Sequence, residues 1–239
     1  MKLWKLALCA ATASFGLAGA ALADSAPTGP QVAWNAAITN DYVFRGISQN
    51  AGNAAGSGGI DVTDNIVYVG TWLSNVNFGD KTRFENDLYG GVRPTVAGIS
   101  LDLGVIYYNY IDAPHGSDWN YWEAKALASK AFGPVTIGGA FYYSPEYTGH
   151  NGNSEYYEVN GAYTMANKAT ISGAVGYKAL SKSDTGISGY GTWNIGVTYP
   201  LNDHLGIDLR YIGTDHHADT FFTQPLAGDR LAATLKATF

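Results

Sequence analysis

Histidine, serine and acidic residues are the groups that would carry catalysis or bind a metal, and they form no recognised motif. The chain has five histidines, His115, His150, His204, His216 and His217, and it contains no G-x-S-x-G sequence. The run from Asp215 to Asp219 offers imidazole and carboxylate groups to a divalent cation. Neighbouring histidines point different ways on an extended chain, so a solvated loop is the simpler interpretation. The sequence therefore predicts no catalytic residue, no metal site and no cofactor.

Charged side chains instead recur on one face of alternating segments. We take twelve of them as candidate pore-lining residues: Arg45, Arg83, Glu85, Asp87, Asp102, Glu123, Lys125, Glu158, Asp208, Arg210, Arg230 and Lys236. Asp41, Arg93 and Lys178 share this face. Burying so many charges in a dry interior costs free energy. The charges must therefore line a hydrated lumen, or pair densely enough to fill a narrow barrel.

The distribution of these charges suggests a transverse field. Arg45, Arg210 and Arg230 fall on strands that neighbour one another across the barrel closure, in their outer halves. Acidic residues are expected on the opposite wall, interrupted by two bases: Glu85, Asp87 and Glu123, with Arg83 and Lys125. Such a field would orient small polar or zwitterionic solutes. Local pairing between neighbouring strands is the alternative.

The elements that must position these charges are β-strands. From Ile99 to Tyr108 apolar and small or polar residues alternate, and the last ten residues repeat the pattern. Pro94, Pro134 and Pro200 fall at tight turns, at or beyond the ends of the alternating segments, as expected if strands are paired on both edges. The pattern predicts strands over 31–47, 54–63, 66–76, 82–93, 98–111, 119–132, 134–145, 154–165, 168–180, 189–200, 204–213 and 229–239.

About twelve antiparallel strands predict an all-β transmembrane barrel. Short turns alternate with longer polar loops, the pattern of outer-membrane barrels with periplasmic turns and extracellular loops. Aromatic residues are expected in two outward-facing girdles: Trp34, Phe132, Tyr163, Tyr199 and Phe239 at the turn end, and Tyr42, Phe44, Tyr107, Tyr143, Tyr157 and Tyr211 nearer the loops. A soluble barrel or sandwich also alternates, but it would not require these girdles.

The two ends of the sequence support export to the outer membrane of a Gram-negative bacterium. Residues 1–23 have the basic start and apolar stretch of a signal peptide, with cleavage expected between Ala23 and Asp24. Residues 24–239 then form a single barrel domain without cysteine, since Cys9 is the only one. The chain stops on Phe239 like the terminal signal read by the barrel assembly machinery. Periplasmic chaperones and outer-membrane lipid are the other expected partners.

Several segments resemble a known family: Tyr42-Val-Phe-Arg-Gly-Ile-Ser-Gln49, Gly70-Thr-Trp-Leu-Ser-Asn75, Ile106-Tyr-Tyr-Asn-Tyr110, Ser144-Pro-Glu-Tyr147 and Tyr156-Tyr-Glu158. They are similar to the TorF-like porins of proteobacterial outer membranes. The resemblance covers nearly the whole mature chain, and it implies a porin-type barrel. It implies no substrate and no catalytic residue.

The sequence thus predicts a passive channel for small hydrophilic solutes. The excess of acidic over basic residues argues against nucleic acid as a partner. A non-conducting barrel, with a structural role or with loops that bind a partner, is the second interpretation, and an outer-membrane enzyme is the third. A barrel of twelve strands lies between filled eight-stranded barrels and open sixteen-stranded porins. Its width alone therefore does not decide between an open channel and a filled barrel.

Overall fold

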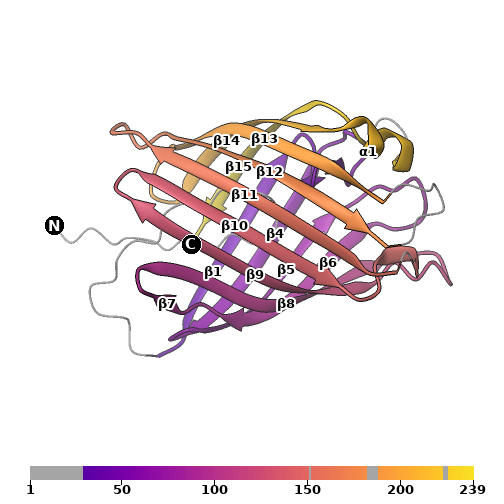
Figure 1. Ribbon diagram of the computed structural model, residues 1–239, viewed down its shortest axis with the longest axis horizontal. Coiled ribbons are helices and arrows are strands. Elements are labelled where there is room, and N and C mark those ends of the chain that lie inside the picture. Colours follow the sequence, from indigo (N-terminus) through magenta and orange to yellow (C-terminus); the bar gives the residue numbers. More distant parts are fainter. Residues whose placement is uncertain (1–28, 151, 182–187, 223–225) are drawn as a thin grey trace.

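A computed structural model describes residues 29–150, 152–181, 188–222 and 226–239. The predicted signal peptide and its cleavage point lie outside the described residues. Twelve long strands form the wall (Figure 1). They are β1 (Gln31–Thr39), β4 (Ala55–Asp64), β5 (Val67–Asn75), β6 (Phe84–Val92), β8 (Ile99–Ile111), β9 (Tyr121–Phe132), β10 (Val135–Ser144), β11 (Ser154–Thr164), β12 (Thr170–Leu180), β13 (Gly189–Pro200), β14 (Leu205–Thr214) and β15 (Arg230–Thr238). The predicted number of long strands is confirmed.

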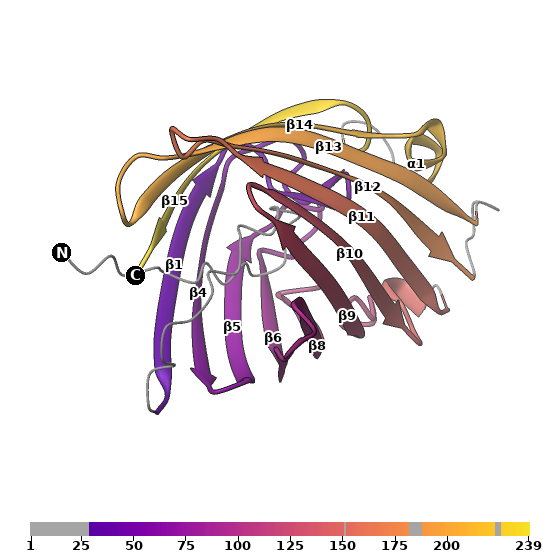
Figure 2. The same ribbon diagram turned by 60° about the vertical axis from the view of Figure 1, so that its left-hand side comes forward.

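The wall closes on itself. Each strand pairs antiparallel with its neighbour along the chain, and β1 pairs with both β4 and β15. All strands tilt in the same sense around the closed wall, as Figures 1 and 2 show. The two-residue strand β7 (Thr95–Val96) extends the turn between β6 and β8. Closure leaves no free sheet edge, which is the condition for strands to cross a membrane.

Apolar side chains cover the outside of the wall. Leu231 is 71% exposed, Val32 65% and Ile195 59%, although each lies within a paired strand. Tyr163, Tyr199, Phe132 and Trp34 are exposed at the turn end, as predicted. An apolar exterior bordered by aromatic residues is the surface that lipid selects, so this is a transmembrane barrel. Among the described residues, no helix has the length and apolarity needed to cross a membrane.

The first predicted strand is wrong beyond Thr39. The chain leaves the wall there and forms a small hairpin, β2 (Val43–Phe44) and β3 (Ile47–Ser48), that pairs with itself and not with the barrel. Tyr42, which we expected to face lipid, is 5% exposed and lies among interior side chains, and Phe44 packs against the same interior cluster. The cause is the two-residue turn Arg45-Gly46, whose left-handed backbone reverses the chain.

Two further short elements lie at the loop end, opposite the end of β15 (Figure 1). The 3-10 helix η1 (Thr148–His150) follows β10, and the helix α1 (His216–Phe221) follows β14. Asp215 caps α1, because its carboxylate accepts hydrogen bonds from the backbone N–H groups of His217 and, across the loop, Gly191. The carboxylate that the sequence suggested as a metal ligand therefore has a structural role.

Aromatic rings stack at the seam between the first and last strands. The ring of Phe239 lies 4.2 Å from that of Trp34 and 5.1 Å from that of His204, centroid to centroid. The backbone N–H of each of Phe239 and Trp34 donates to the carbonyl of the other, at 2.9 and 3.0 Å. The C-terminal residue therefore fastens the seam at the turn end.

Replacing Phe239 with Ala is expected to weaken this seam. Each aromatic contact contributes about 0.5–1.5 kcal/mol beyond burial, so the folded barrel should unfold at lower urea concentration. The folded fraction in vesicles is measured by electrophoresis of unboiled samples, in which folded and unfolded barrels migrate differently. Phe132→Ala is the matched control, since Phe132 is an exposed aromatic residue at the same end. Equal shifts for both variants would show that the stack contributes nothing specific.

Candidate functional site

The bore of the barrel contains the hairpin 40–54. Arg45 and Gly46 have φ values of 47° and 82°, the left-handed pair of a type I′ turn. Phe44 pairs with Ile47 on either side of this turn, so the hairpin is a tight two-stranded finger. Its tip points into the space that the wall encloses, and a side chain on Gly46 would overlap the methyl group of Thr214 on β14.

At the tip of the hairpin, the side chain of Arg45 reaches the opposite wall of the barrel. Its guanidinium forms a two-pronged ion pair with Glu123 on β9, Nη1 to Oε1 and Nη2 to Oε2, both at 2.7 Å. The guanidinium carbon lies 4.5 Å from the ring centroids of Tyr142 on β10 and Tyr156 on β11. Arg45 is 4% exposed and Glu123 1%. Burial opposes the charge, but the Glu123 carboxylate holds the pKa of Arg45 above its ordinary value.

A second cation shares the same carboxylate. The ammonium of Lys178 on β12 lies 3.5 Å from Oε1 of Glu123 and donates to the hydroxyl of Ser154 at 2.9 Å. It also sits 3.9 Å from the ring centroid of Tyr147. Tyr108 donates its hydroxyl proton to Oε2 of Glu123 at 3.1 Å. One carboxylate therefore compensates two buried cations, and it is the centre of this cluster of charges.

The base of the hairpin contacts an acidic wall. Tyr42 donates to Oε1 of Glu85 on β6 at 2.8 Å, and its ring packs edge-on against Trp72 of β5. Burial raises the pKa of the Tyr42 hydroxyl, so this group stays protonated and remains a donor. Glu85 and Asp87 are 2% and 0% exposed. The predicted acidic residues of β6 therefore face inward, and the hairpin contacts Glu85 through Tyr42.

The hairpin is also fastened on its own side of the bore. Asp41 accepts from the hydroxyl of Ser48 at 2.6 Å and forms an ion pair with Arg230 of β15 at 2.9 Å. Ile47 packs with Tyr190 of β13 and with Ala218 of α1. The loop that carries α1 therefore supports the finger from the loop end of the barrel.

Nearer the turn end the charges pair locally. Asp102 binds Lys125 at 3.0 Å and Arg93 at 3.1 Å, and it accepts the hydroxyl proton of Tyr68 at 2.6 Å. On the other wall Arg210 pairs with its strand neighbour Asp208 at 3.0 Å. Asp102 and Arg93 are partly exposed, at 19% and 26%, whereas Lys125, Asp208 and Arg210 are buried. These charges are therefore compensated within the wall, without a contribution from the hairpin.

The remaining candidate residues take different positions. Glu158 of β11 faces inward, where it accepts hydrogen bonds from Tyr156 and Asn160, and Lys236 of β15 is half-buried. Arg83 lies outside the bore: it precedes β6, is 76% exposed and approaches Asp112 at 4.0 Å. The expectation that Arg83 interrupts the inner acidic wall is corrected, because the chain has already left the wall at this point.

The arrangement of charges in the bore differs from the predicted transverse field, which required a basic wall facing an acidic wall. Arg45 reaches its acidic partner directly across the bore, whereas Arg210 and Arg230 are paired on their own side. The inner tyrosines that complete the site were not singled out from the sequence. The alternation could have identified them, since Tyr108 lies on the same strand face as Asp102 and Tyr156 on the same face as Glu158.

Gly46→Val is expected to unseat the hairpin. The substitution places a β-branched residue at a positive φ and drives its side chain into Thr214. Strain of this kind costs about 1–3 kcal/mol, while the wall strands keep all their pairs. Limited proteolysis of refolded barrels should then cut within residues 40–54 of the variant faster than in the parent. Gly52→Val is the control, because Gly52 also has positive φ but has open space around it; equal cleavage would contradict the role of the tip.

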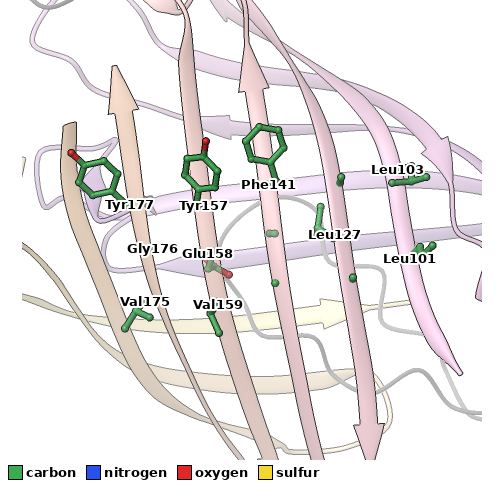
Figure 3. A pocket seen from close by; sticks show the side chains of 14 residues that line it. Leu101, Leu103, Leu127, Phe141, Tyr157, Glu158, Val159, Val175, Gly176 and Tyr177 are labelled. Carbon is green, nitrogen blue, oxygen red and sulfur yellow. The ribbon is translucent and has the colours of Figure 1, made fainter. Parts of the chain in front are cut away.

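A hollow of about 660 Å³ lies on the outer surface, away from the bore. Figure 3 shows Phe141, Tyr157 and Tyr177 in one row across β10 to β12, with Val159 and Val175 in the next. The hollow exists because the outward residues that continue these rows onto β9 and β10 are short, namely Ala126, Ala128 and Gly139. Its outward apolar lining belongs to the lipid-facing surface, so it provides no route for polar solutes.

Comparisons place the chain among known proteins. A family model described as "Bacterial protein of unknown function (Gcw_chp)" matches residues 23–239. No curated protein matches the chain significantly. The solved NanC porin is similar over 87% of this chain and 99% of its own, with TM-score 0.56 and 8% identity. The KdgM porin is similar over 87% and 98%, with TM-score 0.57 and 9% identity. At these identities the likeness shows a common barrel fold.

Proposed function

The chain belongs to the Gcw_chp family, and from its fold and bore we propose that it is a porin-like outer-membrane channel for passive diffusion of small hydrophilic solutes. The hairpin 40–54 closes the channel in the conformation described. The observation that carries the proposal is the Arg45–Glu123 pair, because it joins a separable finger to the wall across the bore. Without the finger, the interior would be lined by charged, hydroxyl and amide side chains that favour water.

Hydration explains the charged residues that the finger contacts. Glu85, bound by Tyr42, and Glu123, bound by Arg45, are 2% and 1% exposed with the hairpin in place. A wall designed only to be filled would be stabilised better by apolar residues, since replacing buried ion pairs with apolar side chains is often neutral or stabilising. When the finger moves away, water reaches these charges, and the free-energy cost of keeping them out of water disappears in the open state.

One observation favours the second candidate, a non-conducting barrel. The hairpin contacts the wall on several sides: Tyr42 meets β5 and β6, Arg45 meets β9, and Asp41 meets β15. A finger held at so many points would serve as a permanent core. Under this alternative the barrel acts through its loops or by stabilising the envelope.

Arg45→Ala tests the channel against the filled barrel. Removing one partner of a buried pair costs about 3 kcal/mol or more, which corresponds to a roughly hundredfold shift of an equilibrium. Recordings from refolded protein in planar bilayers should give brief openings for the parent and long ones for the variant. Arg45→Lys keeps the charge and should lie between them.

The outcome that rejects the channel is equally clear. If both variants insert and fold but carry no more current than bare lipid, the bore is permanently filled and the second candidate replaces the first. Insertion is verified by the change in electrophoretic mobility between unboiled and boiled samples.

The proposal includes the route to the membrane. Residues 1–23 are removed as a signal peptide between Ala23 and Asp24, periplasmic chaperones and the barrel assembly machinery act on the unfolded barrel, and Phe239 forms part of the assembly signal. The resemblance of the segment from Tyr42 to Gln49 to TorF-like porins supports this placement, and this segment is the closing finger itself. The protein needs no cofactor and catalyses no reaction in this proposal.

A further inference from the structure

The pocket that receives Arg45 is built mainly by the wall, although the ring of Phe44 in the hairpin also lies 4.6 Å from the guanidinium carbon. Glu123 comes from β9, Tyr142 from β10 and Tyr156 from β11, which are consecutive strands of the barrel. Tyr142 is paired with Tyr156 in the β10–β11 register and with Lys125 in the β9–β10 register. Because the sheet fixes these positions, the carboxylate and the two tyrosine rings keep their arrangement when the hairpin leaves.

Its chemistry matches a guanidinium group more closely than other cations. Both carboxylate oxygens of Glu123 are 2.7 Å from separate guanidinium nitrogens, the parallel geometry that a planar fork satisfies and a single ammonium does not. Two tyrosine rings lie 4.5 Å from the guanidinium carbon, within the range of cation–π attraction. Charge, fork geometry and aromatic contacts thus select one chemical class.

We propose that this pocket is a guanidinium-binding site, that Arg45 occupies it as an internal ligand, and that guanidinium-bearing solutes are recognised there when the hairpin withdraws. The inference rests on the proposed channel for its biological role, but the binding itself does not require conduction. Lys178 and Tyr108 keep Glu123 oriented after Arg45 leaves, because both contact the carboxylate independently of the hairpin.

The tether determines when an external cation can bind. A group attached by a short linker has an effective concentration in the millimolar range or above, and the Asp41 and Tyr42 contacts hold the hairpin further in place. Free guanidinium at low millimolar concentration should therefore compete poorly in the parent protein. Once the Arg45 side chain is truncated, the same cation meets an empty pocket.

The test uses the refolded full-length barrel with methylguanidinium chloride as the probe. In Arg45→Ala, methylguanidinium should raise the urea midpoint of unfolding saturably, and it should shorten channel openings over the same concentration range. Methylammonium chloride and sodium chloride at equal ionic strength should do neither. The double variant Arg45→Ala, Glu123→Gln has the same cavity without the carboxylate, and it should lose the response to methylguanidinium.

Two results overturn the inference: methylguanidinium acts no differently from methylammonium in Arg45→Ala, or the double variant responds as strongly as the single one. If Arg45→Ala does not fold, Arg45→Gln, with its smaller loss of side-chain volume, takes its place and is judged by the same comparisons. The unfolding measurement works on a barrel that never conducts. Binding without current therefore rejects only the channel, and current without selective binding rejects only the guanidinium site.

Discussion

Replacing residues 40–54 with a two-residue Asn-Gly turn is expected to convert the closed barrel into a steadily open pore. Thr39 and Ala55 are directly paired across β1 and β4, so a two-residue type I′ turn joins them without changing the register. The deletion removes the finger and every contact it makes across the bore, while all strand pairs of the wall remain.

The physical reason for an open pore is the character of the surface that the deletion exposes. Glu85 and Glu123 would lose the Tyr42 and Arg45 contacts that cover them, and charged side chains draw water into the space left by the finger. Planar-bilayer recordings should show continuous ohmic current, and liposomes should admit small sugars.

A matched control for the deletion shortens a different loop. Removing residues 113–117, between β8 and β9, trims the mouth but leaves the finger in place, and this variant should stay as closed as the parent. If the hairpin deletion folds and remains closed, other side chains block the bore, and the finger is not the gate.

Replacing Glu123 with Ala is expected to destabilise the folded barrel more than any other single charge removal described here. Arg45 and Lys178 would remain buried, at 4% and 1% exposure, with their shared carboxylate gone. Uncompensated burial of this kind costs about 3–5 kcal/mol per broken pair. The hairpin can relieve part of the cost by leaving the bore, so the variant should combine a lower urea midpoint with a higher open probability.

Two comparisons separate this effect from loss of side-chain volume. Glu158→Ala removes the same residue type from the inward face of β11, where it accepts two hydrogen bonds, and should cost only about 1 kcal/mol. Adding Lys178→Met to Glu123→Ala removes one unpaired cation and should restore part of the lost stability. If the added substitution lowers stability further, charge compensation is not what Glu123 provides.

The barrel itself was predictable because alternation has a period of two and the wall obeys it throughout. Ile99 to Tyr108 and the final strand read directly as one apolar face and one polar face, and both lie in the wall where expected. Turn positions followed from proline and glycine. Local sequence was sufficient here, since lipid on one side and charge on the other impose the same pattern on every strand.

The finger was not predictable by the same reasoning. Tyr42 and Phe44 continue the alternation of β1, so parity assigned them to lipid, yet the chain leaves the wall after Thr39 and carries them inward ahead of the reversal at Arg45-Gly46. Asn-Gly and Asp-Gly are the usual type I′ pairs, and an arginine in the first position gives no such signal. What holds Arg45 in a left-handed conformation is a carboxylate 78 residues later in the chain, and local patterns contain no information about that partner.

Asn40 links the finger to the seam of the barrel. Its side-chain amide donates to the carbonyl of Leu231 at 3.0 Å and its side-chain oxygen accepts the N–H of Ala233 at 2.6 Å, both on the last strand. The residue from which the finger departs is thus positioned by β15, on the seam where β1 and β15 close the wall. Closing the cylinder and setting the angle at which the finger leaves the wall are therefore one event, so a substitution that loosens this seam should also displace the finger.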